Sequence, residues 1–475
     1  MSMALAADDP VAKAQAAADI ALSNADTAFM LVAAALVLLM TPGLAFFYGG
    51  FVRSRNVLNT MMMSLILMGV VGVTWVLWGY SLSFAPGNKF IGGLQWLFMN
   101  NVDTAAGYYI PKDALPAGNL GAFFVDAVKG DGSYSPTIPH QLFAMFQMMF
   151  AIITPALISG AIVERTSFKI YFWFIVLWSG LFYPFLAHMV WGVGGFLGVN
   201  GGIGALDFAG GTVVHISSGV SALVAAWMIG PRKTYPNQPA APHNVAYILL
   251  GAGLLWFGWF GFNGGSALAS GGLATAASFT TTTSASAAAL VWVILEWVLR
   301  GKPTAVGIAT GAVAGLVGIT PAAGFVSPVS ALLIGALTST ACFFAVSLKA
   351  KMQFDDSLDT FPVHGVGGTI GAILTGVFAQ GKINPILGKT GDVANPVGLL
   401  EGHAAQLGTQ IVAVLITYVL SALATFVILK VLELVFGGLR VKQESEYQGL
   451  DINEHGEEAY GEELASGLSY SSSNK

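Results

Sequence analysis

The sequence contains very little charge. Charged residues make up only 9% of its 475 positions, whereas hydrophobic residues make up 55%. A soluble domain carries about a quarter charged residues, so this composition excludes an ordinary soluble globular chain. The net charge of −5 and the scattered basic residues also provide no basic patch of the kind that nucleic acids require. We therefore expect a membrane protein without a nucleic-acid partner.

Cysteine is almost absent. The single cysteine, Cys342, lies within an apolar run, which excludes a disulfide framework and a cluster of thiolate metal ligands. We expect no metal, no cofactor and no enzymatic activity. An electron carrier that holds haem with intramembrane histidines remains an alternative, and a Soret band in the purified protein would identify it.

Long apolar runs are what the chain has in abundance. A transmembrane helix needs about 20 mostly apolar residues, and eleven stretches meet this requirement. We expect an all-α membrane protein with eleven transmembrane helices, in which a membrane domain (27–436) lies between an N-terminal tail (1–26) and a C-terminal tail (437–475). The expected spans are 27–49, 60–84, 139–163, 168–190, 210–230, 243–263, 273–299, 303–320, 326–348, 361–380 and 403–436.

The N-terminal motif "MSMALAADDP" places "ALA" just ahead of acidic residues. This arrangement resembles the end of a signal-peptide cleavage site that lacks its apolar core. An ordinary alanine-rich tail is the alternative reading, and the residues do not decide between the two.

Basic residues predict the orientation, because cytoplasmic loops are enriched in Lys and Arg. Twelve of them follow the odd-numbered spans and so share one side, while six lie on the other side, in the tail and two long loops. We therefore expect the N-terminus outside and the C-terminus in the cytoplasm. The twelve are Arg53, Arg55, Arg165, Lys169, Arg232, Lys233, Arg300, Lys302, Lys349, Lys351, Arg440 and Lys442.

Spans one to five resemble spans six to ten. "AFFYGG" ends span one and "WFGFNGG" ends span six, while span five contains "VVHISSGVSALVAA" and span ten contains "PVHGVGGTIGAILTG". An offset of five spans inverts the second set, and inverted repeats place functional sites near the midplane between the halves. His215 and His364 occupy matching positions, so we expect them to meet. Two neutral imidazoles can share one N–H, each fixing the tautomer of the other.

The motifs together resemble the ammonium transporter (Amt/Mep/Rh) family, in its bacterial-type Amt branch. They follow in order along nearly the whole chain, from "TPGLAFFYGG" to "GLDINEHGEEAYG", and include "ALDFAGGTVVHI", "AHMVWG", "WFGFNGGSA" and "DDSLDTFPVHGVGG". The resemblance implies a homotrimer in the inner (plasma) membrane with one ammonium or ammonia pore per subunit. It also implies a cytoplasmic tail that packs on the inner face and supports binding of a PII-family regulatory protein.

The resemblance further implies roles for single residues. For each aromatic residue the alternative is simple packing against the core or the lipid. Asp207 also sits directly before span five, where a carboxylate can cap the helix, so we expect a structural role there and attraction of cations as a secondary effect. The matched positions are Trp191, Ser266, Phe150 and Asp207 for substrate binding, Phe150 and Phe262 for the pore gate, His215 and His364 for the pore relay, and Phe146 and Gln147 for the vestibule.

The expected mechanism follows from the cost of burying charge. An intact ammonium ion at mid-membrane costs at least ~2.5–3.5 kcal/mol, so we expect deprotonation outside, passage of ammonia, and a separately relayed proton. Uncharged transport, a Rh-like ammonia/CO2 gas channel and an ammonium sensor with little flux remain alternatives. The second outer loop, 85–138, is longer than the family norm and could cover the vestibule or be mere decoration.

Overall fold

The computed structural model describes residues 10–116, 124–126, 128–237, 241–384 and 397–460. The N-terminal cleavage-site motif falls outside these ranges. Within them, ten helices are long and apolar enough to cross a membrane, and Ala305–Ile319 is a shorter apolar helix. The eleven expected spans are therefore present, and the all-α architecture is confirmed.

Several spans combine an α-helix with a π-helical turn. The first five spans are α1 (Pro10–Phe51); α2, η3 and α3 (Val57–Thr74, Trp75–Gly79 and Tyr80–Phe84); α4 (His140–Ser159); α5, η6 and α6 (Phe168–Leu177, Trp178–Phe182 and Tyr183–Trp191); and η7 with α7 (Gly211–Ile216 and Ser217–Ile229). The other six are α8 with η8 (Val245–Trp259 and Phe260–Gly264), α9 (Gly272–Arg300), α10 (Ala305–Ile319), α11 (Pro328–Lys351), η10 with α12 (Phe361–Val366 and Gly367–Phe378), and α13 (Ala404–Phe436).

Short elements connect the spans. They are η2 (Ser54–Asn56), η4 (Leu97–Met99), η5 (Lys112–Ala114), η9 (Gly265–Ala267), η12 (Leu399–Glu401), α14 (Gln443–Gln448) and η13 (Asp451–His455), together with strands β1 (Phe124–Val125) and β2 (Gly132–Ser133). The two strands pair antiparallel in the loop between α3 and α4.

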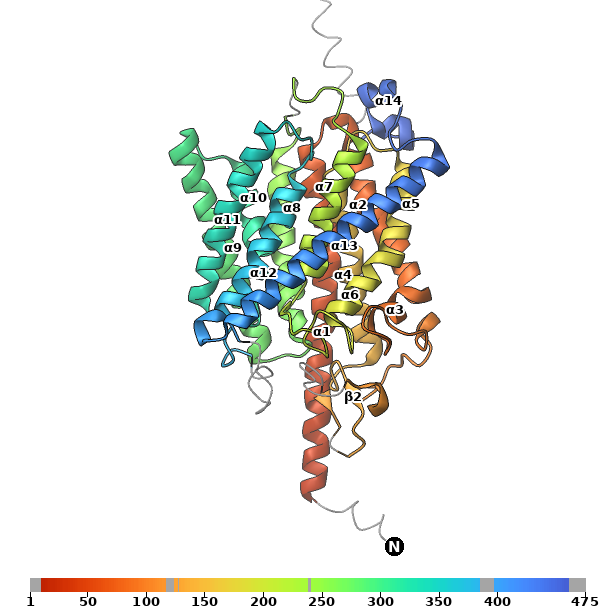
Figure 1. The fold of residues 1–475 in the computed structure, drawn as a ribbon, viewed down its shortest axis with the longest axis vertical. Coiled ribbons are helices and arrows are strands. Elements are labelled where there is room, and N and C mark those ends of the chain that lie inside the picture. Colours follow the sequence, from red (N-terminus) through yellow and green to blue (C-terminus); the bar gives the residue numbers. More distant parts are fainter. Residues whose placement is uncertain (1–9, 117–123, 127, 238–240, 385–396, 461–475) are drawn as a thin grey trace, which may run out of the picture.

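The first helix is longer than the sequence pattern predicts. The expected span begins at residue 27, but α1 is already helical at Pro10 and runs for 42 residues. At 1.5 Å per residue this is about 63 Å, twice the thickness of the hydrocarbon core. Its first turns stand clear of the bundle at one end, and α14 lies at the opposite end (Figure 1). We call these ends the vestibule face, where α1 and α4 begin, and the tail face, where α14 lies.

The two halves of the repeat interlock at the histidine turns. Turn η7 packs against α12, and turn η10 packs against α7. A glycine follows each histidine by four residues, and neither has room for a side chain. A Cβ on Gly219 would lie 2.2 Å from the backbone N of Gly365, and one on Gly368 would lie 3.0 Å from the Cβ of His215. These glycines let the histidine turn of one half approach the helix of the other.

Span ten starts where the sequence indicates. Asp359 and Thr360 precede it and Pro362 lies in its first turn, which is a helix-start signature. In the structure the carboxylate of Asp356 accepts the backbone N–H groups of Thr360 (3.1 Å) and Phe361 (2.7 Å). Asp359 instead adopts φ +59° and pairs with Lys349 Nζ at 2.5 Å. The cap comes from a residue one turn earlier because the chain bends sharply at Asp359.

A buried ion-pair network joins the loops of the tail face. Glu164 is fully buried and pairs with Arg53 and Arg232, each at 2.8 Å, while Arg232 also pairs with Asp355 at 2.8 Å. Burial by itself would raise the pKa of Glu164, but the two guanidinium groups outweigh it and lower that pKa to about 2. The network therefore stays charged at physiological pH and ties together the loops after spans one, three, five and nine.

The C-terminal tail packs on the tail face, but mainly through polar contacts. The spaced apolar residues of the tail are predicted to anchor it, yet Tyr447 and Ile452 are 45% and 48% exposed. Of this set Leu450 is fully buried, and Tyr460 shares a hydrogen bond of 2.7 Å with His243. Carboxylates of the tail add further contacts, which the apolar pattern could not reveal.

Candidate functional site

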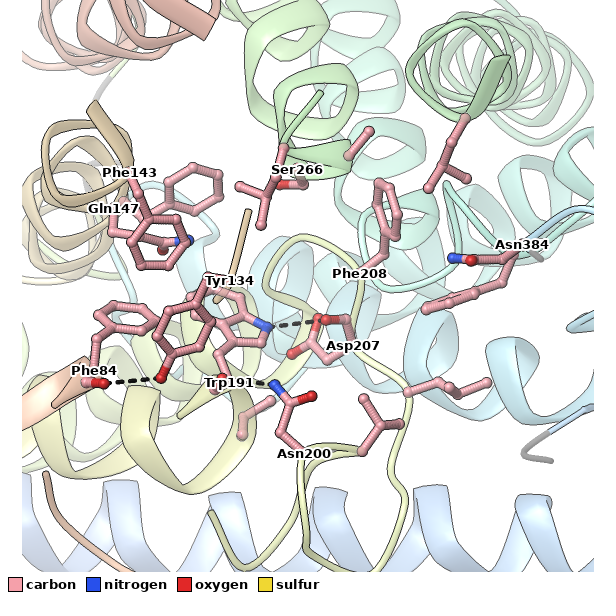
Figure 2. A pocket seen from close by; sticks show the side chains of 18 of the residues that line it. Phe84, Tyr134, Phe143, Gln147, Trp191, Asn200, Asp207, Phe208, Ser266 and Asn384 are labelled. Carbon is pink, nitrogen blue, oxygen red and sulfur yellow. Dashed lines mark hydrogen bonds between the residues drawn. The ribbon is translucent and has the colours of Figure 1, made fainter. Parts of the chain in front are cut away.

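A hollow of about 1050 Å³ opens at the vestibule face (Figure 2). Trp191, Ser266, Phe150, Gln147 and Asp207 line it, so the structure brings together five of the six residues expected at the binding site and vestibule. The sixth, Phe146, does not line the hollow. It is fully buried behind the wall, where its ring would meet a side chain on Gly265 at 2.7 Å. Its place is that of a packing residue.

The indole of Trp191 is held firmly. Trp191 ends α6, and its Nε1–H donates to the backbone carbonyl of Asp207 at 2.9 Å. The side-chain amide of Asn200 donates to the carbonyl of Trp191 at 3.0 Å. The ring also meets Phe150 edge-on, with centroids 6.0 Å apart. With its N–H engaged, the indole can offer the hollow only its π surface, the part that attracts cations.

The hydroxyl of Ser266 is oriented by its own helix. Ser266 lies in η9, and its Oγ donates to the carbonyl of Phe262 at 2.7 Å. Because the hydroxyl proton is used there, the oxygen lone pairs remain for a donor in the hollow. Gln147 adds a second acceptor, since its buried Oε1 has no hydrogen-bond partner within the described part of the chain.

Asp207 is fully occupied by the start of span five. Its Oδ1 accepts from the backbone N–H groups of Gly210 (2.7 Å) and Gly211 (2.6 Å), and its Oδ2 accepts from that of Thr212 (2.8 Å). The hydroxyl of Thr212 donates to the same carboxylate. This is the capping arrangement expected from the sequence, and it holds η7, the turn that carries His215. Asp207 also fixes Trp191 through its carbonyl group.

Two phenylalanines, packed with their rings tilted by 32°, close the floor of the hollow. The ring centroids of Phe150 and Phe262 lie 4.2 Å apart, and each residue is only 1% exposed. Phe262 belongs both to this barrier and to a second, narrow cavity beneath it, lined mostly by apolar side chains. The barrier thus separates the hollow from the interior of the bundle.

The second cavity contains both histidines. The Nδ1 atoms of His215 and His364 lie 3.3 Å apart, and the rings are nearly parallel at 24°. One ring must donate through Nδ1 and the other must accept. The donating ring then has an acceptor Nε2, and the accepting ring has an Nε2–H donor. Nε2 of His215 is buried in this cavity and has no hydrogen-bond partner among the described residues.

A third cavity continues from His364 toward the tail face. It is narrow, and Tyr48, Thr310, Asp359 and Thr360 supply polar groups to it besides His364. Phe47 and Val313 line the second and third cavities alike. Hollow, barrier, histidine cavity and third cavity therefore follow one another through the middle of the fold.

Sequence reasoning missed several residues that line the hollow. His188 is not one of them: it is expected to hydrogen-bond within the scaffold, and its two nitrogens lie 3.0 Å and 2.8 Å from the carbonyl oxygens of Ser83 and Asn88. The unexpected lining residues come from loops, where residue spacing carries no periodic signal. They include Phe84, Tyr134, Phe143, Asn200, Phe208 and Asn384.

Known proteins resemble the chain over nearly its whole length. A model of the Ammonium Transporter Family matches residues 28–460. The ammonium transporter of Bacillus subtilis (strain 168) is 48% identical over 436 residues, which cover 92% of this chain and 98% of that protein. The ammonium transporter of Aquifex aeolicus (strain VF5) is 46% identical over 446 residues, covering 94% and 95%.

Solved structures show the same likeness. Candida albicans Mep2 superposes with a TM-score of 0.76 at 32% identity, covering 89% of this chain and 87% of that one. A protein named Sensor Amt Protein superposes with a TM-score of 0.75 at 29% identity, covering 91% and 99%.

Proposed function

The chain belongs to the ammonium transporter family, and from this premise we propose that it carries ammonium across the membrane by passing ammonia along the histidine-lined path. The observation that carries the proposal is the sequence of sites along one line. A hollow lined by Trp191, Ser266 and Gln147 leads to an aromatic barrier, and a mostly apolar cavity with two histidines lies behind it. Such an order suits an ion that loses its charge before it enters.

Recruitment takes place in the hollow. An ammonium ion over the Trp191 ring gains about 0.5–2 kcal/mol from the cation–π contact. It can donate its N–H groups to Ser266 Oγ and Gln147 Oε1, which belong to residues that line the hollow. The carboxylate of Asp207 contributes long-range attraction only, because its oxygens are engaged by η7.

Removal of the proton precedes entry. The cavity beneath Phe150 and Phe262 is lined mostly by apolar side chains, and an intact ion there costs at least ~2.5–3.5 kcal/mol. Neutral ammonia carries no charge and therefore does not incur this free-energy cost. The histidine pair then offers it one acceptor and one donor in turn, and the shared N–H between the rings provides a route for a separate proton. We favour net transfer of one charge per molecule.

The assembly and orientation extend the proposal. We place the vestibule face outside the cell and the tail face in the cytoplasm, since the basic loop residues Arg53, Arg165 and Arg232 meet at the tail face. The protein would act as a homotrimer in the plasma membrane, with one path in each subunit, a 27–436 membrane domain and a cytoplasmic 437–475 tail.

Current recording tests the function and the role of Trp191 together. Proteoliposomes on a supported membrane should give a transient current upon an ammonium step. Trp191→Leu should raise the half-saturating concentration by up to about 30-fold, which corresponds to the ~2 kcal/mol of a desolvated cation–π contact. Ser266→Ala should act in the same direction but more weakly, because it removes a single acceptor.

Trp227→Leu is the matched control, because that tryptophan is 66% exposed on α7, away from the hollow. Its concentration dependence should equal that of the wild type. If Trp191→Leu behaves like this control, Trp191 is only an interfacial residue. A wild-type protein that binds ammonium but gives no current would instead identify a sensor.

A regulatory partner is the second part of the proposal. The tail face presents basic loops beside a docked acidic tail, and a trimeric PII-family protein could contact three such faces at once, so that weak contacts act together. We expect a PII protein of the host to co-purify with the transporter after an ammonium pulse. It should be absent from nitrogen-starved cells, and equal recovery from both cultures, or from neither, would contradict this part.

A further inference from the structure

The long loop between α3 and α4 is anchored at the vestibule face by aromatic stacking. Tyr109, in the middle of this loop, stacks on His140 at the start of α4, with centroids 3.7 Å apart and planes 8° apart. Backbone hydrogen bonds of Ile110 with Gly132, at 2.9 Å and 2.7 Å, then join the two arms of the loop. The described part of this loop is therefore a fixed piece of the fold.

One loop residue, Tyr134, is locked in place at both its ring and its hydroxyl. Its ring lies parallel to that of Phe143 at 4.7 Å and meets Phe84 edge-on at 5.5 Å. Its hydroxyl donates to the carbonyl of Phe84 at 2.9 Å and accepts from the backbone N–H of Val193 at 3.0 Å. The hydroxyl thus bridges the end of α3 and the turn after Trp191.

The same loop reaches the hollow where recruitment is proposed. Tyr134 and Phe124, from β1, both line the hollow with Trp191 and Ser266. Figure 2 shows Tyr134 grouped with Phe143 and Trp191 on one side of it. Next to Tyr134, Ser135 Oγ donates to the carbonyl of Leu268 at 3.0 Å, which ties the loop to the segment that carries Ser266.

We propose that Tyr134 and Phe124 form an additional aromatic wall of the binding hollow, and that this wall selects ammonium over alkylated ammonium ions. The inference rests on the proposed transport function and adds a determinant of substrate size to it. Because the Tyr134 hydroxyl is engaged on both sides, its ring acts through bulk and π surface. It limits the room beside Trp191 for any group larger than a hydrogen atom on the cation.

The magnitude follows from the size of a methyl group. A hydrophobic pocket discriminates one such group by about 10- to 200-fold, and a hollow open to water gives the lower end of that range. Ammonium keeps its contacts with Trp191 and Ser266 when the wall is removed, whereas methylammonium gains space. The ratio of the half-saturating concentrations, methylammonium over ammonium, should therefore fall.

The experiment measures this ratio by current recording. Tyr134→Ala should lower the ratio about tenfold, whereas Tyr134→Phe should leave it within about twofold of wild type. The two variants lose the same hydrogen bonds to Phe84 and Val193, so the difference between them isolates the ring. Phe124→Ala, at a residue 42% exposed, should lower the ratio by a smaller factor.

Each outcome decides the proposal. An unchanged ratio in Tyr134→Ala overturns it, and an equal shift in Tyr134→Phe assigns the effect to the hydrogen bonds and overturns it as well. If Tyr134→Ala does not fold, Tyr134→Leu and Phe124→Ala test the proposal instead. Wild-type ratios in both of these variants overturn it. A wild-type protein without ammonium current contradicts the proposed function instead.

Discussion

Replacing either histidine of the pair with an acid is expected to abolish selective ammonium transport. In His215→Glu or His364→Glu a group that ionises stands where two neutral rings now share an N–H at 3.3 Å. A fixed negative charge in this cavity stabilises a bare cation, which the neutral pair does not. We therefore expect the ammonium-evoked current to fall at least tenfold or a potassium current to appear.

The neutral variants His215→Gln and His364→Gln separate the effect of charge from the loss of the ring. Glutamine supplies a donor and an acceptor but cannot pass a proton through a ring. These variants should lose electrogenic flux without gaining potassium permeation. Potassium steps on the same proteoliposomes measure the second quantity. If both acid variants keep the wild-type ammonium current and pass no potassium, the histidines serve only packing.

The histidine pair also illustrates what the sequence could predict. Eleven apolar runs define the spans, and the recurrence of a histidine before small residues five spans apart predicts that the two rings meet. These signals are periodic or repeated along the chain, so they can be recognised from the sequence alone. The glycines four residues after each histidine carried the same information, because close helix approach demands them there.

Other features depend on how loops fold back, and no periodic signal reveals them. Asp359 precedes span ten directly, yet Asp356 caps it because the backbone turns at φ +59°. Phe146 is one helical turn before Phe150 and was expected to line the vestibule, but it faces Gly265. Tyr134 lies in a loop that could only be noted as long, and its ring reaches the hollow through contacts with Phe84 and Phe143.

The tail provides the second large expected effect. Three of its carboxylates bind groups of the membrane domain at the tail face. Asp451 accepts the backbone N–H groups of Leu58 (3.0 Å) and Asn59 (2.8 Å) at the start of α2, and Glu454 accepts that of Phe168 (2.8 Å) at the start of α5. The tail therefore caps two membrane helices, α2 and α5, to which it is not directly connected in sequence.

A third carboxylate links the tail to the ion-pair network. Glu446 pairs with Arg440 at 2.7 Å and accepts the backbone N–H of Lys233 at 2.6 Å, directly beside Arg232. Arg165 donates to the carbonyl of Gly230 at 2.7 Å in the same loop, and burial lowers the pKa of Arg165 to about 10. A movement of the tail would thus displace the loop that follows span five, the span that carries His215.

Cutting the chain after Arg440 is expected to leave the protein in the membrane but to lower its ammonium current several-fold. The cut removes two helix caps, each worth about 0.5–2 kcal/mol, and leaves Arg440 without Glu446. The membrane spans themselves stay intact, so assembly should persist while the tail face loosens and the subunits of the proposed trimer lose their coupling. A cut after Tyr460 is the matched control, since it keeps every tail contact named above.

The double variant Asp451→Asn, Glu454→Gln keeps the full-length chain and weakens both helix caps, so its ammonium current should fall between those of the two truncated proteins. Full activity of the protein cut after Arg440 would show that the tail is dispensable and that its carboxylates do no more than cover the tail face.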